Sequence, residues 1–231
     1  LYRDFIAHTL HQQSTNDSET YFKELLGTIE TPTYPFDLSN VRGSGRDIKD
    51  SELLIPEEMS KEIRAVSAKL GMSPAVLFHA AYGLLIGKCS NSDYAIFGSL
   101  FSGRLQGAAN SVDSLGLFIN TLPFLSELKG NVSEYITNVK KGLNELLPYE
   151  QTSIAEIQNW SGVSNDVPLF SAILNYRHSA VPSGEVSNGI DLGINKHGGH
   201  ESSNYPFSID VDDYGDHFGL IAQIDTRIDG D

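Results

Sequence analysis

The sequence SLFSGRLQGAANSVDSLGLFINTLPF, residues 99–124, carries the pattern that decides the fold. An apolar run ends in Ser102, Gly103 and Arg104, small residues follow, and a second apolar segment then carries Asn120 and Thr121. A strand buried in a core needs none of these polar groups. The stretch therefore predicts two strands whose polar ends form a candidate site.

Upstream of this stretch the pattern is mainly helical. We expect a short helix at 18–26, a strand at 52–55, and amphipathic helices at 56–70 and 74–88. In the helix at 56–70, the stripe predicted to pack on a sheet consists of Met59, Ile63, Val66 and Leu70. The helix at 74–88 has a wider apolar face, so we expect it to be well buried.

Strands and helices alternate through the rest of the chain. The expected elements are strands at 94–101 and 116–125, helices at 132–147 and 153–160, a strand at 169–177, and a closing hairpin that turns at 213–216. This order predicts an α/β (α+β) fold, in which a mixed β-sheet and packed helices form a two-layer sandwich.

Charge and composition exclude several classes of protein. The 231 residues carry a net charge of −14, which would repel nucleic acid and anionic membranes. Cys89 is the only cysteine, so there is no internal disulfide, and no apolar run approaches the roughly 20 residues of a membrane span. The first residues do not read as a secretory signal, so we expect a cytoplasmic protein.

Several possible sites have simpler explanations. His197, His200 and Glu201 could ligate zinc, but glycines separate the histidines and no third ligand is fixed, so we expect no metal. The aspartates between 210 and 216 fail the EF-hand register and are expected to hold a hairpin turn and its solvated face. The loop at 39–47 is interpreted as a linker, and the hydrolase elbow is absent around Ser102.

Two motifs in the deciding stretch resemble those of a known family. Gly98 to Arg104 and Gly116 to Pro123 resemble the Gly-x-x-x-Ser-Gly-Arg and Gly-x-Phe-(Val/Ile)-Asn-Thr-Leu-Pro patterns of non-ribosomal peptide synthetase condensation domains. Segments LYRDF, LPYEQTSIAEI and VPLFSAILNYRHS are similar to further family segments in the same order. Tyr149 to Gln151 and residues 164–166 depart from the family pattern, which leaves the subclass open.

The resemblance implies one lobe of a two-lobed, chloramphenicol-acetyltransferase-like fold. Residues 1–231 would be the carboxy-terminal lobe, with an amino-terminal segment and linker at 1–48, a core at 49–231, and both ends trimmed. The family's His-His-x-x-x-Asp-Gly motif belongs to the other lobe and is absent here. This chain would therefore contain no catalytic base and would be inactive alone.

The resemblance also implies a substrate tunnel between the lobes. Ser102, Gly103 and Arg104 would face it, and Asn175, Arg177 and His178 would be further lining residues. For Asn120 and Thr121 a structural role is favoured, Asn120 tying two strands through its amide. Arg104 has the alternative of pairing with Asp113.

The implied partners are those of an assembly line. They are the amino-terminal lobe, donor and acceptor peptidyl carrier proteins with their phosphopantetheine arms, and an adjacent adenylation domain. No cofactor would bind the chain directly, and a partly apolar interlobe face would favour self-association. The predicted reaction is amide-bond formation between a carrier-bound thioester and an amine. The alternatives are an epimerisation or cyclisation lobe, or a non-catalytic carrier-docking module.

Overall fold

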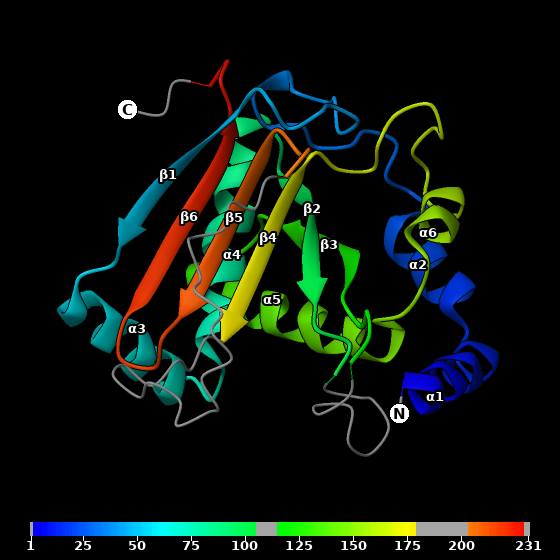
Figure 1. Cartoon of the computed structure of the whole chain (residues 1–231), viewed down its shortest axis with the longest axis horizontal. Helices are drawn as coiled ribbons and strands as arrows, with labels where there is room; N and C mark the ends of the chain where they lie inside the picture. The colour runs from blue at the N-terminus through cyan, green and yellow to red at the C-terminus, as the bar shows by residue number, and fades with distance from the viewer. Residues whose placement is uncertain (1, 105–114, 179–202, 229–231) are drawn as a thin grey trace, which may run out of the picture.

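The computed structural model describes residues 2–104, 115–178 and 203–228, and these build one six-stranded sheet (Figure 1). The strands in spatial order are β1 (Ile48–Leu54), β6 (Phe218–Asp225), β5 (Phe207–Asp213), β4 (Ala172–His178), β2 (Tyr94–Phe101) and β3 (Asn120–Glu127). β4 runs parallel to both β2 and β5, while the other pairs are antiparallel. The predicted mixed sheet is confirmed.

Helices cover one face of this sheet (Figure 1). α4 (Pro74–Cys89) lies behind β2 and β4, and α5 (Val132–Leu146) lies behind β3. α3 (Glu57–Lys69) packs beside the start of α4, and three helices lie at the β3 side: α1 (Tyr2–Thr15), α2 (Ser18–Leu26) and α6 (Ile154–Trp160). Short 3₁₀ helices occupy Pro35–Asp37 (η1) and Leu147–Tyr149 (η2).

The core lies between α4, α5 and the sheet. Ile86 of α4 and the rings of Phe97 and Phe124 are buried there. α4 approaches β3 closely because Gly83 has no side chain, and a Cβ at that position would lie 2.6 Å from the Ser126 hydroxyl. Phe22 of α2 is also fully buried in this cluster, so the segment before the sheet is part of the same core.

Most of the predicted elements are confirmed. The helix at 18–26 has the predicted bounds, and α5 begins with a capping box between Asn131 and Glu134. The final hairpin is also confirmed. Three strands begin at other residues than predicted: β1 at Ile48, β3 at Asn120 and β4 at Ala172. α1 was not predicted, since its sequence has little apolar periodicity and Phe5 alone is buried.

The predicted packing of α3 is wrong. Met59 and Val66, expected to face the sheet, are 52% and 45% exposed, whereas the buried residues are Ser60 and Ser67. The reason is polar: Arg64 forms an ion pair with buried Asp213 and so fixes which side of α3 faces the sheet. α4 also exposes Leu84 and Leu85 at 47% and 40%, so its burial is incomplete.

Among the described residues, no single helix has the length and apolar composition of a membrane span; α3 and α4 meet that test only as a pair, bent by 105°.

Candidate functional site at the carboxyl edge of the sheet

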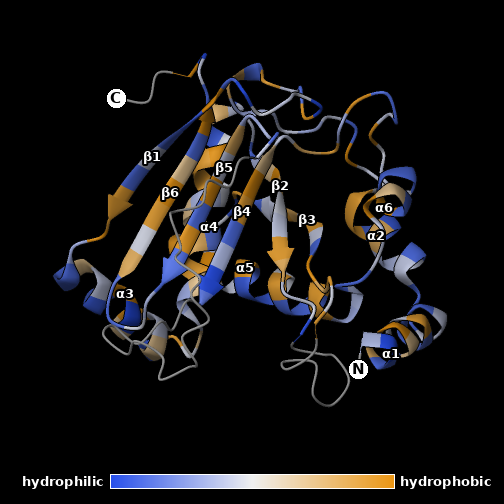
Figure 2. Ribbon diagram, in the orientation of Figure 1, coloured by the Kyte–Doolittle hydropathy of each residue, from blue (hydrophilic) through white to orange (hydrophobic). Residues whose placement is uncertain are grey.

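The three parallel strands β2, β4 and β5 end at the same edge of the sheet, the lower edge in Figure 1. In open sheets with parallel strands, ligands bind beyond the carboxyl ends of those strands. Ser102 to Arg104 follow β2, and Asn175 to His178 end β4, so both predicted groups lie at this edge. The ends of β4 and β5 are hydrophilic where their upper parts are apolar (Figure 2).

The turn after β2 is built around Gly103. Its φ of +65° is a left-handed conformation, which side chains rarely adopt. A Cβ on Gly103 would lie 2.0 Å from the Phe118 carbonyl oxygen and 2.7 Å from the Gln151 amide nitrogen. The turn is therefore pressed against the segment that leads into β3, and glycine is required there.

Phe118 connects this turn to α1. Its ring is 2% exposed and lies 4.5 Å from the Phe5 ring and 5.3 Å from the Tyr2 ring, between centroids. The Arg104 guanidinium carbon lies 4.1 Å from the centroid of the same ring. The Phe118 carbonyl accepts a 3.0 Å hydrogen bond from the Gln151 side chain. Arg104 therefore leaves the turn along an aromatic surface held by three separate segments.

Asn120 and Thr121 point away from each other. The Asn120 amide donates to the carbonyls of Glu150 and Thr152, both at 2.9 Å, and so ties β3 to the connection between η2 and α6. Its bonds go to that connection and not to a second strand. The Thr121 methyl faces Gly98, where a Cβ would come within 2.8 Å. These contacts support a structural role for both residues.

The residues at the end of β4 are divided between the two faces of the sheet. On the face opposite the helices, called the open face below, Asn175 donates to Asp210 at 2.7 Å. Arg177 binds Asp212 through two hydrogen bonds of 2.8 and 3.0 Å. His178 points to the helix-covered face, where its ring lies 3.4 Å from Asp213. Asn175 and Arg177 are thus brought together with two aspartates, and His178 is separated from them.

Asp213 is the centre of a polar cluster under α3. It accepts hydrogen bonds from Arg64, from the Tyr176 hydroxyl at 2.6 Å and from the Gly215 backbone at 3.0 Å. Burial would raise the pKa of Asp213, but these donors outweigh it and hold the pKa well below its usual range. The expectation of a solvated aspartate face is wrong here, since Asp212 and Asp213 are 6% and 3% exposed.

A second buried polar pair joins α4 to β2. His79 Nδ1 donates to the Ala75 carbonyl at 2.7 Å, so Nε2 accepts from the Ser99 hydroxyl at 2.8 Å. Burial lowers the pKa of His79 to about 4, although the bond to Ala75 acts in the opposite direction. His79 is therefore neutral and buried within the core, and does not face the edge.

An apolar strip continues the edge beside the Ser102 turn. We define it as Leu115, Leu117 and Ile119, which are 95%, 75% and 58% exposed, while Phe118 between them is buried. Alternate residues thus point outward from an extended segment. Exposed aliphatic side chains in a row are typical of a surface that another chain covers.

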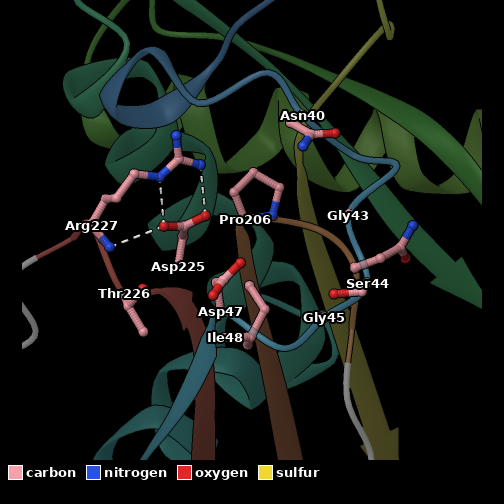
Figure 3. A pocket seen from close by; sticks show the side chains of 11 residues that line it. Asn40, Gly43, Ser44, Gly45, Asp47, Ile48, Pro206, Asp225, Thr226 and Arg227 are labelled. Carbon is pink, nitrogen blue, oxygen red and sulfur yellow. Dashed lines mark hydrogen bonds and ion pairs between the residues drawn. The ribbon is translucent and has the colours of Figure 1, made fainter.

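A pocket of about 440 Å³ lies at the opposite edge, where β1 begins and β6 ends (Figure 3). The loop at 39–47 contributes Gly43 and Ser44, and Arg227 lies across from them. The Arg227 guanidinium is held by two hydrogen bonds, of 2.8 and 2.7 Å, to buried Asp225. This bidentate ion pair holds the segment after β6 in place, which is a structural role.

In the ranges 2–104, 115–178 and 203–228, no group of three histidine, cysteine or acidic side chains is arranged for a metal. His197, His200 and Glu201, considered above as zinc ligands, lie outside the described residues, as does Asp113. Cys89 is partly buried, and burial raises the pKa of its thiol, which suits a packing role.

The sequence did not single out Phe118 or Gln151 as part of the site. Phe118 stands in the quoted motif, but its contact with Arg104 depends on a turn that periodicity does not describe. Gln151 reaches a carbonyl 33 residues away. The polar residue pair Glu150–Gln151 before a helix was the one available signal, and it does not specify a partner.

The structure is a mixed α/β sheet, covered by helices on one face, with polar side chains at the carboxyl edge of its parallel strands. The family model described as condensation domain matches residues 1–225. The chain is 35% identical over 99% of its length to malpibaldin synthetase and 36% identical over 96% to malpinin synthetase, both from Mortierella alpina. The chain therefore belongs to the condensation-domain family. It spans 4% and 3% of the length of these relatives.

Solved structures agree on the fold. The X-domain from teicoplanin biosynthesis matches with a TM-score of 0.74 at 15% identity, over 97% of this chain and 53% of that one. The condensation domain from the monacolin K polyketide synthase matches at 0.71 and 14%, over 95% and 54%. An epimerization domain of tyrocidine synthetase B matches at 0.66 and 15%, over 95% and 52%.

Proposed function

We propose that this chain is the carboxy-terminal lobe of a condensation domain that joins a carrier-bound thioester to a carrier-bound amine. The observation that carries the proposal is the edge itself: parallel strands β2 and β4 deliver Arg104 and Arg177 to one side of the sheet, next to the exposed apolar strip. Membership of the condensation-domain family supplies the reaction class.

In this proposal the edge is one wall of a tunnel. Aminolysis of a thioester moves the acyl group from sulfur to nitrogen, and a proton leaves the attacking amine. Most of the catalytic gain comes from holding the two reactants at the right distance and angle. The Ser102 hydroxyl and the Arg104 guanidinium are orienting groups for the thioester or the phosphopantetheine arm, and the base comes from the amino-terminal lobe.

The proposed partners follow from this arrangement. The amino-terminal lobe covers the apolar strip, and the two carrier proteins deliver their arms to the tunnel. An adenylation domain of the same synthetase loads the acceptor. In isolation the strip is exposed, and the chain self-associates through it.

The experiment is an amide-formation assay by intact-protein mass spectrometry, with loaded donor and acceptor carrier proteins. It compares this chain with a protein extended upstream through a His-His-x-x-x-Asp-Gly lobe. We expect transfer by the extended protein alone, and a slower rate in its Arg104→Ala variant. The matched control is Arg42→Ala, an exposed arginine in the loop at the opposite edge, which should transfer normally.

Two outcomes would overturn the proposal. If the extended protein binds both carriers but transfers nothing, a docking module is the better description. If it exchanges the α-hydrogen of the bound aminoacyl group with solvent and forms no amide, the lobe belongs to an epimerisation domain.

A further inference from the structure

We infer that Phe118 is a positioning residue for Arg104: its buried ring is the platform on which the guanidinium is held toward the proposed tunnel. The inference rests on the proposed function for its catalytic meaning, but not for its geometry. The guanidinium carbon of Arg104 lies 4.1 Å from the ring centroid, well within the roughly 6 Å that a cation–π contact allows.

Contacts with α1 restrain the Phe118 ring. Its ring is packed against Phe5 and meets the Tyr2 ring edge-on at 87°. The Tyr2 hydroxyl also donates to the Leu117 carbonyl at 2.9 Å. α1 therefore supports the ring that Arg104 also contacts.

The backbone of Phe118 also restrains the turn that precedes Arg104. Its carbonyl accepts from Gln151 at 3.0 Å and is the atom that the Gly103 turn approaches most closely. A single residue thus sets both the turn that carries Arg104 and the surface along which its side chain lies. A long flexible side chain loses much of its rotamer freedom in such a setting, so less entropy remains to be lost when substrate binds.

The two arginines at this edge are held by different kinds of contact. Arg177 forms two hydrogen bonds to Asp212, whereas the Arg104 guanidinium lies over the Phe118 ring. A planar guanidinium that lies over an aromatic face suits an orienting group for a polar or anionic part of a substrate arm.

The test is a double-mutant cycle in the extended condensing protein. Phe118→Leu keeps an apolar side chain and removes the aromatic face, and we expect transfer to slow about fivefold, within the range of a cation–π contact. In an Arg104→Ala background, the same substitution should change the rate little. Phe118→Tyr should restore the wild-type rate. The control, Phe36→Leu, removes a ring that packs against Phe207 at the opposite edge of the sheet, and it should be additive with Arg104→Ala.

A second measurement needs no variant at position 118 and no activity. In the isolated chain, the Arg104 side-chain protons should show upfield ring-current shifts by NMR, assigned with Arg104→Lys. If the shifts are absent, or if Phe118→Leu slows transfer equally with and without Arg104, Phe118 does not position Arg104. If the shifts are present but neither Arg104→Ala nor Phe118→Leu slows transfer, the platform exists and the proposed tunnel role of Arg104 fails.

Discussion

The two faces of the sheet use the same pair of residue types for different purposes. Asp213 points to the covered face, where Arg64 and Tyr176 bind it beneath α3. Asp212, one residue earlier, points to the open face and binds Arg177 at the edge proposed to meet substrate. Their exposure is similarly low, so the neighbours rather than the burial distinguish them. Strand alternation alone sends one ion pair into the structure and the other to the site.

The largest effect should come from removing the covered pair. Asp213→Ala leaves Arg64 and Tyr176 without their acceptor, and breaking a buried pair from one side typically costs about 3–5 kcal/mol. Asp212→Ala should cost less, since Asp210 lies 3.8 Å from Arg177 and can partly replace Asp212.

Urea denaturation followed by Trp160 fluorescence measures the free energy of unfolding of both variants. Asp216→Ala, in the exposed turn, should unfold like the wild type. An Asp212 variant as unstable as the Asp213 variant would contradict the comparison.

A comparable effect should appear with pH on the covered face. The pKa of His79 is about 4 when folded and about 6.5 when unfolded, so the unfolded chain binds more protons between these values. The stability that neutral His79 contributes is complete above pH 6.5 and is lost as the pH falls to 4. The loss should reach about 3 kcal/mol.

The measurement is the free energy of unfolding at several pH values from 4 to 7. His79→Gln should flatten the slope in this window, whereas His11→Gln, on the exposed side of α1, should leave it unchanged. An unchanged slope in His79→Gln would show that another group titrates.

The smallest effect concerns the turn at the open edge. Gly103→Ala should destabilise the chain by about 2 kcal/mol, because the new Cβ adds a clash with the Phe118 carbonyl to the strain of a positive φ. Gly215→Ala is the matched control: its φ is +92°, but no atom lies within 4 Å, so it carries the strain alone. Equal unfolding free energies in the two variants would show that the contact with Phe118 is loose.

The sequence predicted those helices and turns whose signals lie within a few neighbouring residues. Helices at 18–26 and 132–146 and the final hairpin follow from caps, apolar spacing and turn residues. α3 was misjudged, since an ion pair with a residue 149 positions away fixes its orientation. α1 was missed because Phe5 is its one buried residue, and a single buried ring leaves little periodic signal.

The site residues remain a prediction. The strands that carry Ser102, Arg104, Asn175 and Arg177 are parallel, so these residues lie at the same edge of the sheet. Strand alternation separates His178 from Arg177, but the sequence could not show which of the two faces the helices cover. Nor could it show the contact between Arg104 and Phe118, because the two residues are 14 positions apart in the sequence.

The pairing of an early strand with the last one has a consequence for synthesis. Within the described residues, β1 is an edge strand whose partner is β6, with Ile48 opposite Asp225. During translation β1 therefore leaves the ribosome on the order of ten seconds before its partner exists, at typical rates of about 5–20 residues per second. An unpaired strand edge invites pairing with other chains. The charged side chains of Lys49, Asp50 and Glu52 lie along β1, where they would oppose such encounters until β6 arrives.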